Sequence, residues 1–360
     1  MELLFFLLIS LAAILLSCIV FSNSVEWLGV RLNLSHGVTG SILAAVGTAL
    51  PETIVPIVAI FWGISHENLL KILTGQLSPT GQANEISLGA IIGAPFMLTT
   101  LAFCLIGVSS LLYFKTGRRK SKLIKVDKTV LERDLTFFII SFSLAFLAIF
   151  LERIFHVILA ILLLVLYQVY LYKTIKEEKG GAYEGEDPHE NLDALLLNKF
   201  IPFLKPTTSV ILIQLFISLI FLVFSAHLFV DVIREVSHKL NFPAFIISLL
   251  LAPLATELPE KFNSWLWIRQ KKDTLAVSNI SGALVFQSTF PFTVGLLFTS
   301  WKVTSSLSYL IFVFCLINAA MVLFALKKDK LSYKTFLLCG VFYFVYVFLV
   351  WTYVVSVTVP

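Results

Sequence analysis

Charged residues are scarce in this chain of 360 residues, and their scarcity excludes most classes of soluble protein. Asp, Glu, Lys and Arg make up 14% of the sequence, whereas apolar residues make up 58%. Soluble domains carry about 25% charged residues. The composition is therefore typical of an all-α integral membrane protein. The formal net charge of +5 then bears on orientation in the bilayer, and no nucleic-acid partner is expected.

Cysteine is also rare, and the local motifs of common metal and catalytic sites are missing. The four cysteines lie in apolar runs without Cys-x-x-Cys spacing, which argues against a zinc site or a disulfide framework. We interpret them as buried small hydrophobic residues. The sequence contains no Gly-x-Ser-x-Gly and no His-Glu-x-x-His motif. We therefore expect neither an enzyme nor a resident cofactor.

The sequence does contain ten long apolar runs, each able to cross about 30 Å of hydrocarbon. They are about Leu3–Phe21, Gly37–Gly63, Ile86–Phe114, Leu135–Leu151, Phe155–Tyr172, Thr208–Val232, Phe242–Ile268, Thr274–Thr299, Ser305–Leu326 and Tyr333–Val355. Five runs precede the polar stretch 174–206 and five follow it. This pattern predicts ten transmembrane helices in two groups of five, 1–173 and 207–360, joined by a linker.

The distribution of basic residues predicts the orientation. Loops on one side of the ten spans carry 21 of the 27 Lys and Arg residues, and loops on the other side carry five. Because cytoplasmic loops hold the basic excess, the first side is expected to be cytoplasmic. The linker 174–206 then lies in the cytoplasm and both termini lie outside.

A short motif occurs once in each group of spans. Gly-Thr-Ala-Leu-Pro-Glu at 47–52 aligns without gaps on Ala-Thr-Glu-Leu-Pro-Glu at 255–260. The following span also matches, with Gly93-Ala94 and Thr99-Thr100 in one copy and Gly282-Ala283 and Ser288-Thr289 in the other. The repeated segments cover about 37–114 and 242–299. Five spans separate equivalent positions, so the copies run in opposite directions, as in secondary transporters.

Helix geometry gives the motif a set of hard oxygen ligands. Thr48 and Glu52 are four residues apart, as are Thr256 and Glu260, so each hydroxyl shares a helix face with its carboxylate. A proline before each glutamate lacks an N–H group, which frees the carbonyl oxygens of Gly47 and Ala255. Carboxylate, hydroxyl and carbonyl oxygens are the ligands that calcium and sodium prefer.

At these residues the sequence resembles the sodium/calcium exchangers of the calcium/cation antiporter superfamily. Their two inverted repeats carry Gly-Thr-Ser-x-Pro-Glu, followed by Gly-Asn-x-x-Gly-Ser-Asn-x-x-Asn. The resemblance implies an exchanger of the prokaryotic type, in a prokaryotic cell membrane, with Glu52 and Glu260 as metal ligands for calcium or sodium. Thr48 and Thr256 would assist them.

The chain departs from this pattern at several positions. Ala94 and Ala283 replace the serine that follows each glycine in the family motif. At the position of the family's last polar ligand, this chain has Leu98 in the first repeat and Gln287 in the second. Asn279 keeps a family asparagine. We favour Gln287 as a ligand, whereas Asn279 fits a ligand and an interhelical hydrogen bond equally well.

Glu257 replaces a family serine and allows two interpretations. It lies four residues before Lys261, so the two charges can neutralise each other on one helix. Alternatively, Glu257 is a third carboxylate of the site, one that takes up protons. The two interpretations are left open.

The predicted function is secondary active cation antiport, exchanging calcium for sodium by alternating access at a midplane carboxylate site. The alternative is a proton-coupled calcium/cation antiporter that uses Glu257. A candidate of a different class, an intramembrane enzyme with paired carboxylates, would also need a nucleophile or a metal cluster. Small cations and the lipid bilayer are the expected partners.

Overall fold

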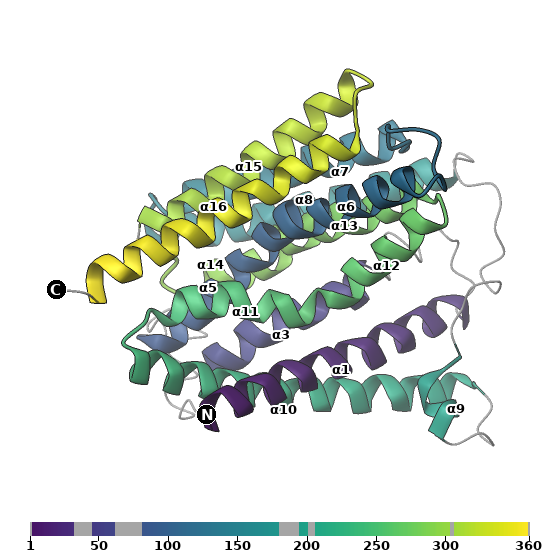
Figure 1. Cartoon of the computed structure of the whole chain (residues 1–360). Coiled ribbons are helices and arrows are strands. Elements are labelled where there is room, and N and C mark those ends of the chain that lie inside the picture. The colour runs from purple at the N-terminus through teal and green to yellow at the C-terminus, as the bar shows by residue number, and fades with distance from the viewer. Residues whose placement is uncertain are drawn as a thin grey trace.

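The computed structural model describes residues 2–31, 45–61, 81–179, 194–200, 206–302 and 306–358, and these residues are almost entirely helical (Figure 1). The helices are α1 (Glu2–Arg31), α3 (Ala45–Phe61), α5 (Gln82–Met97), α6 (Phe103–Lys115), α7 (Lys128–Ala148), α8 (Arg153–Lys179), α9 (Leu196–Phe200), α10 (Thr208–Leu240), α11 (Ala244–Thr256), α12 (Leu258–Arg269), α13 (Asp273–Gln287), α14 (Phe290–Phe298), α15 (Ser306–Lys327) and α16 (Tyr333–Thr358). A π-helical turn, Leu98–Ala102, joins α5 to α6. The all-α prediction is confirmed.

Seven helical segments within the described residues are long and apolar enough to cross a membrane. They are Glu2–Val25, Gln82–Lys115, Arg153–Glu177, Thr208–Leu240, Asp273–Phe298, Leu307–Lys327 and Tyr333–Tyr353. The apolar parts of α3 and α11 are shorter, and α7 begins with charged residues. Parts of the runs expected at 37–63 and 305–326 lie outside the described residues. The count of ten spans stays a prediction.

Helices α1 and α10 lie side by side and antiparallel, along the lower edge of Figure 1. The amide nitrogen of Gln214, near the start of α10, donates to Asn23 and Ser24, near the end of α1, at 3.0 and 2.9 Å. The Gln214 amide oxygen accepts the N–H of Leu197 in α9. A buried amide satisfied by partners from both α1 and α9 fixes the register of this pair.

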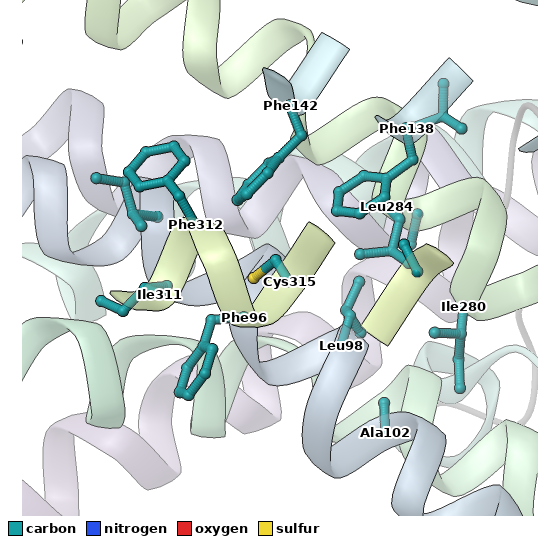
Figure 2. Packing of buried hydrophobic residues seen from close by; sticks show 14 of the residues in the cluster. Phe96, Leu98, Ala102, Phe138, Phe142, Ile280, Leu284, Ile311, Phe312 and Cys315 are labelled. Atoms are coloured by element: carbon teal, nitrogen blue, oxygen red, sulfur yellow. The ribbon is translucent and has the colours of Figure 1, made fainter. Parts of the chain in front are cut away.

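The largest apolar cluster packs α5, α7, α13, α15 and α16 together. Its centre is aromatic: Phe142 lies 5.0 Å from Phe138 and 5.0 Å from Phe312, measured between ring centroids. Figure 2 shows the Phe138 and Phe142 rings of α7 beside the Phe312 ring of α15, with Leu284 and Cys315 nearby. Offset and tilted ring pairs add to the stability that burial provides.

The connections gather at two ends of the helical bundle. At one end Arg119 forms a buried, two-pronged ion pair with Asp273, and Ile124 donates to the carbonyl of Leu331. At the other end the N–H of Ser300 donates to Asn84, and Arg153 donates to the carbonyl of Leu296. The first end therefore collects three of the loops that the basic residues assign to the cytoplasm, and the second collects loops assigned outside.

Candidate functional site

The centre of the candidate site is a break between α11 and α12. Glu257, between the two helices, has φ −95° and ψ 3°, and its N–H donates to the carbonyl of Pro253 at 3.1 Å. Pro259 has no N–H to offer the carbonyl of Ala255, so the oxygen of Ala255 loses its helical partner. The role of the Ala255 carbonyl as a cation ligand stays a prediction.

The equivalent segment of the first half is a continuous helix. Helix α3 runs from Ala45 to Phe61 through Pro51 and Pro56. Gly47 lies in its first turn, whereas the side chain of Thr48 lies outside the described residues. The two copies of the motif therefore differ in backbone shape, and a full break occurs only at Glu257 among the described parts of the two segments.

Three carboxylates converge at this break. The exposed fractions of Glu52, Glu257 and Glu260 are 3%, 0% and 1%, and the carboxylate of Glu52 interacts electrostatically with both others. One carboxylate comes from α3 and two from the α11–α12 segment, which are distant in sequence. Like charges at low dielectric repel and are poorly solvated, so this cluster is stable as charged groups only with a cation nearby.

The Glu52 carboxylate is buried and its oxygens are available to bind a cation. Neither of its oxygens has a hydrogen-bond partner within the described residues. The hydroxyl of Thr256 lies beside it, but donates its hydrogen to the carbonyl of Ala252 at 3.2 Å. The hydroxyl oxygen retains lone pairs that can bind a cation.

Glu257 and Lys261 form an ion pair inside the bundle. The distance between Lys261 Nζ and Glu257 Oε2 is 3.1 Å, and the exposed fractions of the two side chains are 8% and 0%. The structure therefore supports the interpretation in which the two charges neutralise each other. The amide of Gln287, at the C-terminal end of α13, lies against the same carboxylate, and its Oε1 accepts no hydrogen bond from the described residues.

Asn279 is placed between α13 and α12. Its amide nitrogen lies 3.3 Å from both the carbonyl oxygen of Glu260 and the hydroxyl of Ser264. These contacts give Asn279 an interhelical role, one of the two open interpretations, and hold the backbone of Glu260 in place. In the first half, Leu98 takes the position that Gln287 has in the second and lies in the apolar cluster (Figure 2).

The structure adds one residue that sequence reasoning did not connect to the site. Cys18 of α1 is buried, and it interacts electrostatically with Glu52 and Glu260. Its sequence context is an uninterrupted apolar run, so no local signal distinguishes it from a packing residue. Its position shows that α1 covers the carboxylates.

No three of the His, Cys, Asp and Glu side chains in the described ranges lie close enough together to hold a metal ion. The arrangement can bind a hard cation through carboxylate, amide, hydroxyl and carbonyl oxygens.

Comparison with known proteins finds similarity to cation exchangers, both in sequence and in structure. The family model described as sodium/calcium exchanger protein matches residues 2–176 and 210–352. A structure of the H+/Ca2+ exchanger CAX is 16% identical with a TM-score of 0.69, over 99% of this chain and 87% of that chain. A structure of the sodium-calcium exchanger NCX_Mj is 20% identical with a TM-score of 0.57, over 96% of this chain and 98% of that chain. A search of curated proteins finds no match.

Proposed function

The chain belongs to the sodium/calcium exchanger protein family, and we propose that it is a secondary active antiporter that exchanges calcium for sodium by alternating access. The observation that carries the proposal is the convergence of three buried carboxylates beside a broken helix: Glu52 comes from one half of the chain, and Glu257 and Glu260 come from the other. Charged residues inside membrane helices are costly and therefore point to an ion pathway. Interrupted helices supply the backbone oxygens of such sites.

Within this proposal, Glu52 and Glu260 bind the transported cation directly. Thr48, Thr256 and Gln287 add side-chain oxygens, and the carbonyls of Gly47 and Ala255 add backbone oxygens. Glu257 belongs to the site but is paired with Lys261, and Asn279 positions the backbone of Glu260. This ligand set suits calcium and sodium because all of its donors are hard oxygens.

Exchange rather than one-way transport follows from charge. An empty site holds repelling carboxylates in a medium of low dielectric, so changing access while empty is costly. A site neutralised by cations can change access between the two sides of the membrane. We propose that the α1–α10 pair moves against the rest during this change. The extensive pairing of α1 with α10 and the electrostatic interaction of Cys18 with the carboxylates support that role.

The proposed architecture has two inverted five-helix repeats. Residues 1–173 form the first, 207–360 form the second, and 174–206 form a cytoplasmic linker, with both termini outside a prokaryotic cell membrane. The family match falls in two segments on either side of 177–209, which supports this division. The antiparallel course of α1 and α10, the first spans of the two halves, supports the inversion.

Proton coupling through Glu257 is the second candidate. Complete burial of Glu257 favours it, because burial disfavours the charged form of a carboxyl group. The ion pair with Lys261 favours sodium, because an ammonium partner keeps the carboxylate charged. The two candidates differ in which gradient drives calcium.

The test is calcium uptake into proteoliposomes under an imposed sodium gradient or an imposed proton gradient. We expect the sodium gradient to drive uptake, and we expect Glu52→Gln and Glu260→Gln each to abolish it. Glu235→Gln is the matched control, because Glu235 is half exposed and pairs with Lys239 at a helix end. Unchanged exchange in both site variants would overturn the site, and uptake driven by protons alone would replace sodium as the coupling ion.

A further inference from the structure

The pair of Glu257 and Lys261 places a fixed positive charge among the carboxylates. The Lys261 side chain is 8% exposed, and Nζ lies 3.1 Å from Glu257 Oε2. Glu257 in turn interacts with Glu52 and with Glu260. The ammonium therefore acts on the same cluster that is proposed to bind the transported ions, not on a separate surface patch.

The side-chain pair is not needed to hold the helix break together. The N–H of Lys261 already donates to the carbonyl of Glu257 at 3.2 Å, which closes the first turn of α12 through the backbone. A buried ion pair is also weak evidence for stability, because desolvation offsets its attraction. Because the pair lies beside the other carboxylates, its ammonium group can offset part of the negative charge of the site.

Comparison of the two copies of the motif indicates that Glu257 and Lys261 act together. In the gapless alignment, Glu257 corresponds to Ala49 and Lys261 corresponds to Thr53. The second copy therefore has one more carboxylate and one more ammonium, and the first copy has neither. The extra negative charge comes with its own counter-ion.

We infer that Lys261 is a tethered cation of the transport site, and that it fixes the exchange at one divalent cation for two monovalent cations. With all three carboxylates ionised and one ammonium among them, the empty site has a charge of minus two. One calcium ion or two monovalent cations neutralise that charge, so neither loaded form carries a net charge across the membrane. Without the ammonium, a third monovalent cation would be required.

The inference rests on the proposed antiport and predicts that it is electroneutral. A potential across the membrane acts only on steps that move net charge. We therefore expect the rate of calcium uptake by the unmodified protein to be nearly the same under inside-positive and inside-negative potentials. The same equality is expected whether sodium or protons are the monovalent partner, since both carry one charge.

The variants separate a charge role from a structural one. Lys261→Met leaves a site of minus three, so uptake should recruit a third monovalent cation and become several-fold faster under an inside-positive potential. The double variant Glu257→Gln with Lys261→Met restores minus two, and its uptake should again be independent of potential. Lys239→Met, at an exposed pair, is the control for loss of a lysine.

The experiment uses the full chain in proteoliposomes, and valinomycin with a potassium gradient sets the membrane potential. Sodium-driven and proton-driven uptake are measured in separate experiments. Calcium uptake and monovalent efflux are measured together. Potential-dependent uptake by the unmodified protein or by the double variant overturns the inference, so these two proteins can contradict it even if Lys261→Met does not fold. Absence of calcium uptake in both experiments overturns the proposed antiport itself.

Discussion

Gln287 is the residue whose proposed role can be separated most clearly from packing. Its exposed fraction is 1%, and its amide oxygen accepts no hydrogen bond from the described part of the chain. An unsatisfied buried oxygen is a cost in the folded protein, so removing that oxygen should not in itself lower stability, whereas losing the amide's contact with the Glu257 carboxylate should. If the oxygen is a cation ligand, however, its loss should weaken calcium binding.

We expect Gln287→Leu to weaken calcium binding by about tenfold, which corresponds to about 1.4 kcal/mol. The measurement is the rise in unfolding temperature with calcium concentration in detergent, which reports affinity through mass action. Gln214→Leu is the matched control, because this amide is hydrogen-bonded between α1 and α10. That control should lose stability and keep its calcium affinity; an unchanged affinity in Gln287→Leu would remove it from the site.

Sequence reasoning was strongest for residues that the chain contains twice. The repeated Thr-x-Leu-Pro-Glu led to Glu52 and Glu260, and the structure brings these two carboxylates together. Cys18 has no counterpart in a repeated motif, and its proximity to the glutamates arises from the packing of α1 over α3 and α12. Contacts of that kind depend on tertiary arrangement, so a single sequence does not reveal them.

At the scale of helices, the crossing of α5 and α11 depends on two glycines. A Cβ atom at Gly93 would lie 2.3 Å from the carbonyl oxygen of Leu249, and one at Gly89 would lie 2.4 Å from that of Phe245. The two glycines therefore allow the backbones of α5 and α11 to approach closely. At Gly282 the nearest atom is the Tyr170 hydroxyl at 3.6 Å, so the second copy leaves ordinary space.

We expect Gly93→Ala to destabilise the protein by about 1–3 kcal/mol, because the backbone of α11 would have to move. Gly282→Ala makes the same change in a helix with room for it, and should be neutral or stabilising by up to about 1 kcal/mol. Thermal unfolding of both variants in one detergent measures the difference. Equal stability of the two would contradict the close packing of α5 on α11.

The sequence predicted the helix interruptions only in part. Pro259 signalled the break at Glu257, yet α3 continues through Pro51 and Pro56. Neighbouring helices and side chains can satisfy the carbonyls that a proline frees, so proline alone does not decide between a kink and a break. The matching pairs Thr99-Thr100 and Ser288-Thr289 both lie at irregular turns, the π-helical turn after α5 and the short gap between α13 and α14.

At the scale of the whole molecule, the loops divide into two groups that agree with the charge count. Arg119, Lys125 and Lys128 lie at one end, where Arg119 pairs with Asp273 and Lys128 pairs with Asp329. Arg153 and Lys302 lie near the opposite end, around the contact of Ser300 with Asn84. A fold that mixed these loops would have contradicted the orientation that the sequence predicts. The linker residues 180–193, which carry several acidic side chains, lie outside the described ranges.

This division predicts which end is accessible from outside an intact cell. A cysteine introduced at Lys302 should react with a membrane-impermeant maleimide in intact cells, because that end carries few basic residues and is expected outside. A cysteine introduced at Asp329 should react only after the membrane is opened. Asp329 is 70% exposed, so poor access of the reagent to the side chain itself would not account for protection. The native cysteines are buried or half-buried, and the unmodified protein gives their background. Labelling at Asp329 but not at Lys302 in intact cells would reverse the orientation and place both termini in the cytoplasm.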